Sequence, residues 1–215
     1  MKAWDEIFRS GGFPLEEPHR SIAWLCDLFK KRTFRRVCDL GCGTGRNLVP
    51  LASNGFEAHG IDLSAEGLRR SRRRAGDAGT WVGLVRGDMK KIPYASGSFD
   101  AVICIYAIYQ GTLRDIEEAV SEIHRVLRRG GLAYVTFQTL RSHKYGQGRK
   151  IEDRTFVQDH DIDCSHETGI PHHFSSEDEV RRIMRAFRIV ELELEEFRNG
   201  DGVRHSHWQV LAEKG

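Results

Sequence analysis

The sequence lacks the marks of membrane-spanning and disulfide-rich proteins. No apolar run approaches the ~20 residues that a transmembrane helix needs, and residues 1–13 lack the basic-then-apolar plan of a secretory signal. The five cysteines are an odd number and contain no CxxC pair, which argues against a disulfide framework. The net charge of +2 predicts no obligatory polyanion partner. We therefore expect a soluble cytoplasmic protein whose cysteines are mostly reduced.

Repeats, low-complexity tracts and a second domain are also missing, so we expect one domain over residues 1–215. Instead, apolar strands alternate with helical segments through short joins. This order predicts a doubly wound α/β sheet, with the last two strands forming an antiparallel pair. The expected strands are 35–40, 56–63, 82–89, 99–108, 132–137, 188–197 and 207–214.

Helix boundaries are marked by capping residues. Ser64 stands where an N-cap belongs, before an arginine-rich helix. Thr112-x-x-Asp115 is a capping box, and its helix is expected to close on Gly130-Gly131. Ser176-x-x-Glu179 forms a second box near the C-terminus.

Two segments fall outside the alternation. Residues 1–17 are rich in aromatic residues and glycine, and we interpret them as a cap. Residues 138–174 make a long connection that carries five histidines. Because connections longer than about 12–15 residues are usually functional or disordered, we interpret this segment as a lid or substrate-binding insertion.

The stretch "DLGCGTGRN" follows the first strand and places glycines at 41, 43 and 45. In an open parallel sheet this is the topological switch point, where ligands bind. The G-x-G-x-G spacing departs from the G-x-G-x-x-G of dinucleotide-binding folds, because Arg46 stands where the third glycine belongs. Spacing alone distinguishes the two ligand classes weakly.

Charge distinguishes the ligand classes more strongly. Asp39 would repel a pyrophosphate bound on the loop. The cost is about 3–4 kcal/mol for like charges ~4–6 Å apart at an effective dielectric of 20. The same carboxylate would attract an ammonium and a sulfonium. Asp62, at the end of the second strand, is placed to bind both ribose hydroxyls. Asp88 can accept from an adenine amino group, and Met89 offers an apolar face to the ring. Together these residues predict S-adenosylmethionine as the cofactor.

Four stretches of the sequence carry a resemblance to a known family. "VCDLGCGTG", "GIDLS", "GDMKKIPYASGSFDAVICIYAI" and "EIHRVLRRGGLAYVTF" resemble the successive motifs of class I, seven-stranded S-adenosylmethionine-dependent methyltransferases. The resemblance covers roughly residues 35–137 and implies the strand order 3-2-1-4-5-7-6, with strand seven antiparallel and helices on both faces. The cofactor contacts that we predict with its help are Asp39, Gly41, Cys42, Gly43, Asn47, Asp62, Leu63, Asp88, Met89, Cys104, Ile105 and Phe8.

Two shorter stretches, "WDEIFRSGGFP" and "GIPHHF", resemble small-molecule methyltransferases of the tellurite-resistance-like type. The first implies that Trp4, Phe8 and Phe13 fold over the cofactor. The second draws attention to His172 and His173.

Candidate catalytic residues are His172, His173 and Tyr109. Many relatives carry a His pair after the fourth strand, whereas Tyr109-Gln110 stands there in this chain, so no base is inherited at that place. One of His172 and His173 could contact the substrate or act as a base. Tyr106 and Tyr109 could line the acceptor pocket or pack under the lid. A metal site is an open alternative, although the spacing lacks the regularity of common zinc sites; its candidate ligands are Cys164, His166, His172, His173, His205 and His207.

Three functions are compatible with these features. The first is methyl transfer to a small molecule, which the compact chain and the lid favour. The second is a tRNA or protein methyltransferase that docks its substrate on the helix containing Arg69–Arg74, although a solvated helix face is the favoured explanation of those arginines. The third is a non-catalytic module that binds the cofactor. The Asn/Asp-Pro-Pro-Tyr motif that amino-group methylases of DNA or protein glutamine use after the fourth strand is absent, and "IYAIYQ" stands in its place.

Overall fold

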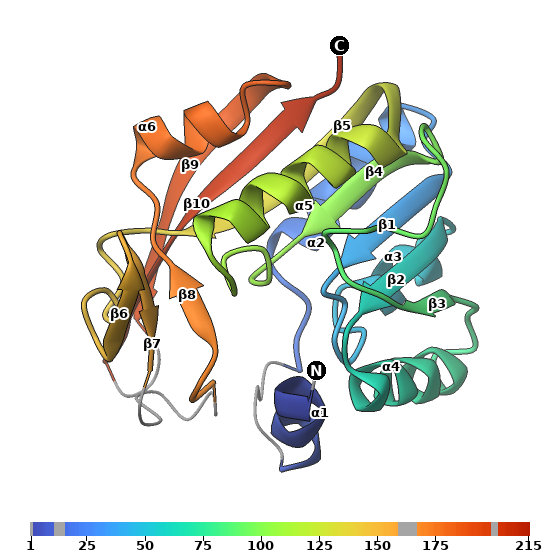
Figure 1. The fold of residues 1–215 in the computed structure, drawn as a ribbon. Coiled ribbons are helices and arrows are strands. Elements are labelled where there is room, and N and C mark those ends of the chain that lie inside the picture. Colours follow the sequence, from blue (N-terminus) through green and yellow to red (C-terminus); the bar gives the residue numbers. More distant parts are fainter. Residues whose placement is uncertain (1, 11–15, 159–166, 199–201) are drawn as a thin grey trace.

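The computed structural model describes residues 2–10, 16–158, 167–198 and 202–215. Its centre is a seven-stranded sheet in the order β3-β2-β1-β4-β5-β10-β9 (Figure 1). The first five strands pair in parallel, and β10 runs antiparallel to both β5 and β9. The strands are β1 Arg36–Leu40, β2 Glu57–Asp62, β3 Gly83–Arg86, β4 Phe99–Cys104, β5 Leu127–Gln138, β9 Arg188–Arg198 and β10 Arg204–Glu213. Since β10 is the last strand of the sheet along the chain, the predicted order and its antiparallel strand are confirmed.

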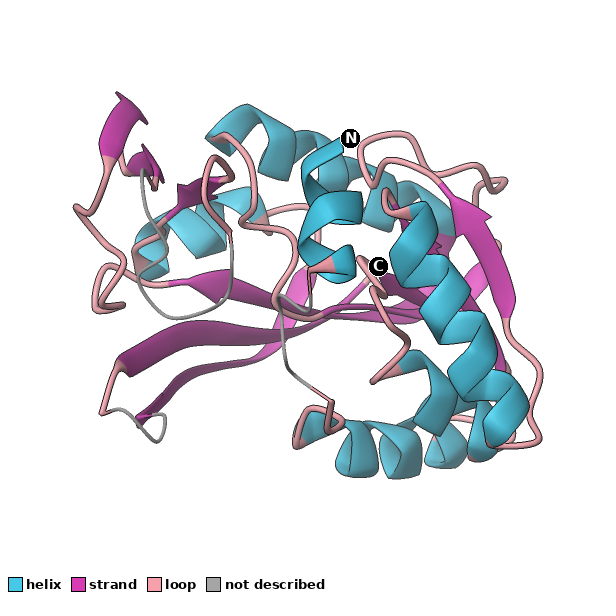
Figure 2. Cartoon of the chain, turned by 90° about the horizontal axis from the view of Figure 1, so that it is seen from below, coloured by secondary structure: helices cyan, strands magenta, loops and turns pink. Residues whose placement is uncertain are grey.

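Helices cover both faces of this sheet, as Figure 2 shows from below. One apolar core packs against α5 and α6, and a second packs against α2 and α3. Strands buried from both sides need apolar residues at nearly every position, which explains the sequence of β4, "FDAVIC". The helices are α1 Lys2–Arg9, α2 Ser21–Lys31, α3 Leu48–Ser53, α4 Ala65–Asp77, α5 Leu113–Val126 and α6 Glu177–Ile183.

The predicted helix starts are present. Ser64 caps α4 by accepting from the Gly67 amide at 3.0 Å, and Thr112 with Asp115 forms the complete capping box of α5. Ser176 caps α6, but the Glu179 carboxylate contacts His173. The predicted end of α5 is wrong: the helix stops at Val126, and the chain enters β5 at Leu127, before the glycine pair.

The long segment after β5 has secondary structure of its own. Strands β6 Arg149–Glu152, β7 Thr155–Val157 and β8 Pro171–His173 form a small antiparallel sheet. Ser175 returns the chain to the main sheet by donating its amide to the Gln138 carbonyl at 2.8 Å. Within the described ranges, no helix is long and apolar enough to cross a membrane.

Candidate functional site

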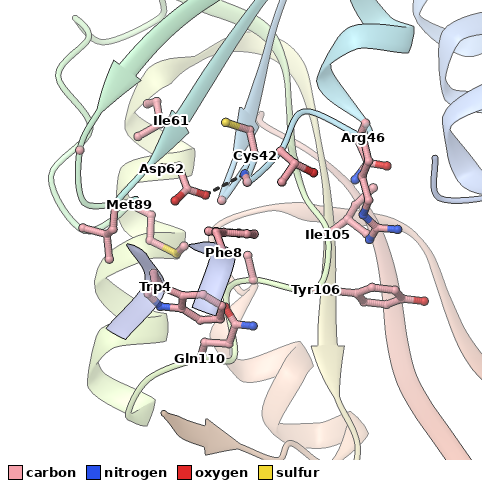
Figure 3. A pocket seen from close by; sticks show the side chains of 17 residues that line it. Trp4, Phe8, Cys42, Arg46, Ile61, Asp62, Met89, Ile105, Tyr106 and Gln110 are labelled. Atoms are coloured by element: carbon pink, nitrogen blue, oxygen red, sulfur yellow. Dashed lines mark hydrogen bonds between the residues drawn. The ribbon is translucent and has the colours of Figure 1, made fainter. Parts of the chain in front are cut away.

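A pocket lies at the carboxyl ends of β1, β2 and β4, beneath α1 (Figure 3). This is the place where an open parallel sheet binds its ligand. The residues that line it come from α1, from the glycine loop, and from the ends of β2, β3 and β4 with the residues that follow them. They are Trp4, Phe8, Gly41, Cys42, Gly43, Thr44, Arg46, Asn47, Ile61, Asp62, Leu63, Gly87, Met89, Ile105, Tyr106, Ala107 and Gln110.

The loop between β1 and α3 needs glycine for conformation and for space. Gly41 and Gly43 have φ angles of +70° and +50°, which L side chains rarely adopt. A Cβ on Gly41 would lie 2.4 Å from the Ala107 Cβ, and one on Gly43 would lie 3.2 Å from the Phe8 ring. The loop therefore presents bare backbone to the pocket.

Asp62 ties the glycine loop to the end of β2. Its Oδ2 accepts from the Gly43 amide and its Oδ1 accepts from the Ser64 amide, both at 2.8 Å. Burial raises the pKa of Asp62. A carboxylate has about four acceptor sites, so these two amides leave each oxygen able to accept a further hydrogen bond from a ligand.

Asp39 is a buried acid behind the loop. Its side chain lies in the sheet with 1% of the residue exposed. Burial raises the pKa of Asp39 to about 8, against the opposing effect of the nearby Arg46. Its Oδ2 atom has no hydrogen-bond partner among the described residues. Such an atom is costly to bury, which makes Asp39 a candidate to bind a cation.

Arg46 provides the opposite charge on the wall of the pocket. The residue is 8% exposed, and its guanidinium stands over the Tyr106 ring at 5.4 Å. Nη1 donates to the Glu17 carbonyl at 3.3 Å, whereas Nη2 has no partner within the described parts of the chain. Burial lowers the pKa of Arg46, but a guanidinium stays charged at neutral pH. In the sequence Arg46 stands out only as a departure from dinucleotide spacing, so its place on the pocket wall was missed.

Helix α1 covers the glycine loop from outside. Asp5 accepts from the Ser64 hydroxyl at 2.6 Å and from the Glu66 amide at 3.0 Å, at the N-terminus of α4. These two hydrogen bonds lower the pKa of Asp5. Phe8 is 6% exposed and lies against Gly43, and Figure 3 shows Trp4 beside it. The cap predicted from Trp4 and Phe8 thus lies over the pocket, whereas Phe13 is outside the described residues.

The arginine-rich helix takes part in holding this cap. Arg70 donates to the Phe8 carbonyl at 3.2 Å, and Arg74 donates to the Glu16 carbonyl at 2.8 Å. Arg69 pairs with Glu66 on its own helix, while Arg72 and Arg73 are exposed. Three arginines of the run therefore contact the protein itself.

Most of the predicted cofactor residues lie on the pocket wall, and three do not. Asp39 lies behind the loop. Cys104 is fully buried in β4, although its neighbour Ile105 lines the pocket. Asp88 stands between the lining residues Gly87 and Met89 and accepts from the Lys90 amide at 2.9 Å. The residues from the prediction that line the pocket are Phe8, Gly41, Cys42, Gly43, Asn47, Asp62, Leu63, Met89 and Ile105.

Tyr106 is held at the end of β4 in a strained conformation. Its φ of +58° is unusual for a residue with a bulky side chain. The hydroxyl donates to Glu195 at 2.8 Å and lies 3.1 Å from His19 Nε2. Burial and the Glu195 carboxylate raise the pKa of Tyr106. Strain of this kind is common at functional sites.

None of the three catalytic candidates is among the described residues that line the pocket. Tyr109 is 7% exposed, and the centroid of its ring is 6.0 Å from that of His172 and 5.6 Å from that of His207. His172 Nε2 is 3.3 Å from a Glu167 oxygen. His173 contacts Thr155 at 2.7 Å and Glu179 at 3.0 Å. Each of these two histidines is 1% exposed.

Two of the candidate metal ligands, Cys164 and His166, are outside the described residues. Two others have aromatic neighbours: His205 stacks on Phe197 with ring centroids 5.0 Å apart, and His207 is buried beside Tyr106. Within the ranges that the structure describes, no three His, Cys, Asp or Glu side chains are grouped so as to hold a metal ion.

The comparisons with known proteins agree with this geometry. Residues 37–131 match the family model described as a methyltransferase domain. This segment is a methyltransferase domain. It begins in β1 and ends in β5, so it contains the glycine loop, Asp62, Met89 and Tyr106. The resemblance to class I methyltransferases is thereby confirmed.

Curated relatives are methyltransferases by name and differ in what those names say they methylate. The malonyl-[acyl-carrier protein] O-methyltransferase of Enterobacter lignolyticus is 37% identical over 123 residues, which are 56% of this chain and 46% of that protein. The demethylmenaquinone methyltransferase of Beutenbergia cavernae is 36% identical over 117 residues, 53% of this chain and 45% of that protein. The chain therefore spans about half the length of these relatives.

Solved structures extend the likeness in fold to nearly the whole chain. A SAM-dependent methyltransferase from Methanosarcina mazei superposes with a TM-score of 0.71 at 23% identity, covering 83% of this chain and 92% of that one. TehB from Haemophilus influenzae superposes with a TM-score of 0.69 at 13% identity, covering 99% of this chain and 67% of that one. The segments outside the methyltransferase domain thus belong to the same fold.

Proposed function

We propose that the protein is an S-adenosylmethionine-dependent methyltransferase that transfers a methyl group to a small molecule by in-line displacement. The observation that carries this proposal is a pair of buried groups at the glycine loop, the Asp39 carboxyl group and the Arg46 guanidinium. Asp39 and Arg46 each have a buried polar atom without a partner among the described residues. An ammonium and a carboxylate, the two charges of an amino acid head group, complement them.

The rest of the pocket fits an adenosine attached to that head group. Asp62 keeps acceptor capacity for two ribose hydroxyls, and Met89 offers a polarizable thioether to an adenine ring. A phosphate would be bound less well, because the amide of Gly43 already donates to Asp62 and because the ionised form of Asp39 would repel a phosphate. The charge pattern therefore supports S-adenosylmethionine over a dinucleotide.

The bound cofactor would supply a methyl group on a sulfonium, which leaves as a neutral thioether. The chain's own contribution is then alignment and exclusion of water, which can supply several kcal/mol, up to about 7–11. Asp62 and Arg46 would fix the two ends of the cofactor, and α1 with Phe8 would shield the pocket from solvent. Tyr106, whose pKa is raised, keeps its proton and forms part of the pocket wall.

Replacing Asp62 with Ala is expected to weaken S-adenosylmethionine binding by roughly 1.5–3 kcal/mol, the scale of hydrogen bonds to a charged group. The loss combines ribose contacts with the support that Asp62 gives to the Gly43 amide. Titration calorimetry on the wild type and the variant measures it. Unchanged affinity would refute the ribose assignment.

His173 is expected to support the structure rather than to take part in catalysis. It joins β8 to β7 through Thr155 and to α6 through Glu179. We expect His173→Ala to lower the unfolding free energy by about 1–3 kcal/mol, as for other buried hydrogen-bonded side chains, with cofactor affinity preserved. Thermal unfolding and calorimetry test this. Intact stability with impaired turnover would instead support a catalytic role.

We also infer that the methyl acceptor is a small molecule, that residues 138–174 form a lid, and that the protein is cytoplasmic. The involvement of Arg69, Arg70 and Arg74 in contacts within the protein disfavours docking of RNA on that helix. Incubation with methyl-labelled cofactor and a panel of N-, O- and S-nucleophiles should yield S-adenosylhomocysteine. Turnover only of RNA or protein, falling steeply with salt, would favour the second function, and binding without turnover the third.

A further inference from the structure

Gln110 connects the pocket to a buried ion pair. Its side chain lines the pocket, and its Nε2 donates to Glu167 Oε1 at 2.9 Å. The other Glu167 oxygen accepts from Lys144 Nζ at 2.6 Å and lies 3.3 Å from His172 Nε2. Both Glu167 and Lys144 are 4% exposed. The residue that faces the pocket is therefore held by a charged network that solvent hardly reaches.

This network determines which way the Gln110 amide faces. Burial alone would raise the pKa of Glu167, but His172 and Lys144 hold it at about 2. The carboxylate is therefore ionised and can only accept hydrogen bonds. The NH2 group of Gln110 must face it, which turns the carbonyl oxygen away from Glu167. Figure 3 draws the Gln110 amide on the opposite side of the pocket from Cys42, next to Trp4.

We propose that the Gln110 carbonyl oxygen selects an amine as the methyl acceptor and that Glu167 is the positioning residue that fixes this amide. The inference rests on the proposed methyltransferase function and deepens it. A carbonyl oxygen accepts a hydrogen bond but is far too weak a base to remove a proton. The nucleophile beside it must therefore carry an N–H or O–H and also have a free lone pair while still protonated.

A neutral amine meets both conditions. One N–H donates to the Gln110 oxygen while the nitrogen lone pair forms the new N–C bond, and the electron pair of the breaking C–S bond stays on sulfur. The nitrogen becomes an ammonium, which then releases its proton to water. A thiolate or carboxylate has no hydrogen to donate and would be repelled by the carbonyl oxygen. An alcohol also carries an O–H and a lone pair, but it is a poor nucleophile until it loses its proton, which Gln110 cannot take.

Three size-matched probes test the inference: benzylamine, benzyl alcohol and benzyl mercaptan, each offered with S-adenosylmethionine. We expect S-adenosylhomocysteine to form with benzylamine only. Gln110→Leu should lower kcat for benzylamine at least tenfold and weaken benzylamine binding to the S-adenosylhomocysteine complex, with cofactor affinity unchanged. Gln147→Leu, which removes an exposed glutamine outside the pocket, is the matched control and should leave both values intact.

Glu167→Gln provides the test of positioning, because an amide in its place no longer dictates how Gln110 faces. We expect a reduced kcat for benzylamine and an unchanged dissociation constant for the cofactor. Turnover of the alcohol, the mercaptan or none of the three probes, or full benzylamine activity in Gln110→Leu, would overturn the inference. Failure to bind S-adenosylmethionine at all would overturn the proposed function instead, so the two failures are distinguishable.

Discussion

Asp39→Asn is expected to weaken S-adenosylmethionine binding by about 10–150-fold at pH 8, corresponding to roughly 1.5–3 kcal/mol for a hydrogen bond to a charged group. The wild-type affinity should itself depend on pH. Because the pKa of Asp39 is raised to about 8 in the protein alone, a cationic ligand must displace a proton below that pH. We expect affinity to rise by up to about tenfold per unit between pH 6 and 8. The Asp39→Asn variant should show a much flatter profile by titration calorimetry.

The same substitution should stabilise the protein in the absence of ligand. The pKa of Asp39 is higher in the folded protein than in the unfolded chain. Between about pH 4 and 8 the carboxyl group therefore holds a proton in the folded state and not in the unfolded state. Stability falls as the pH rises through that window. The neutral amide of Asn removes the free-energy cost of keeping this carboxyl group protonated in the folded protein. That cost has an upper bound of about 4 kcal/mol at pH 7. We expect a higher Tm.

Asp100 provides the matched control. Its carboxylate accepts from the Arg35 and Arg36 amides at 2.8 Å, and despite partial burial its contacts with Arg128 and these amides lower its pKa. Asp100→Asn should therefore lower the Tm and leave cofactor affinity unchanged. A lower Tm for Asp39→Asn, or a pH profile like that of the wild type, would contradict the role of Asp39.

Gly43→Val should abolish cofactor binding while leaving the protein folded. The Cβ atom of the new valine would already lie 3.2 Å from the Phe8 ring. The rest of its side chain would fill the space beside the loop that the cofactor needs. The φ of +50° adds strain of about 1–2 kcal/mol, which a domain of this size can tolerate. Calorimetry measures the binding and circular dichroism the fold.

Gly79→Val separates backbone strain from steric blockage. Gly79 has a φ of +63°, close to that of Gly43, but a Cβ there meets nothing within 4 Å. This control should lose similar stability and keep full cofactor affinity. Binding by Gly43→Val close to the wild-type value would exclude the glycine loop as the cofactor site.

The parts of the site that follow a strand could be predicted from the sequence. The strands β1 and β2 end at Leu40 and Asp62, and in a parallel sheet these ends share one edge. Asp39, the glycine loop and Asp62 were therefore predictable together. The cap of α5 was predictable for a similar reason, since Thr112 and Asp115 act within one turn.

Residues whose position depends on contacts between distant segments were not predictable. Arg46 faces the pocket because Tyr106 and the Glu17 carbonyl hold its guanidinium. Glu167 meets Gln110 across 57 residues of chain. The end of α5 at Val126 reflects the pairing of Leu127 with Phe99 of β4, which ends the helix before its glycines. No local pattern encodes these contacts.

The claim on which this account depends is that buried charges at the glycine loop select a cationic adenosine ligand over a phosphorylated one. Parallel calorimetric titrations of the wild-type protein with S-adenosylmethionine, NADH and ATP at pH 8 test it most directly. We expect S-adenosylmethionine to bind with one site per chain, with NADH and ATP giving no saturable heat. Binding of NADH or ATP in competition with S-adenosylmethionine, or in its place, would contradict the account.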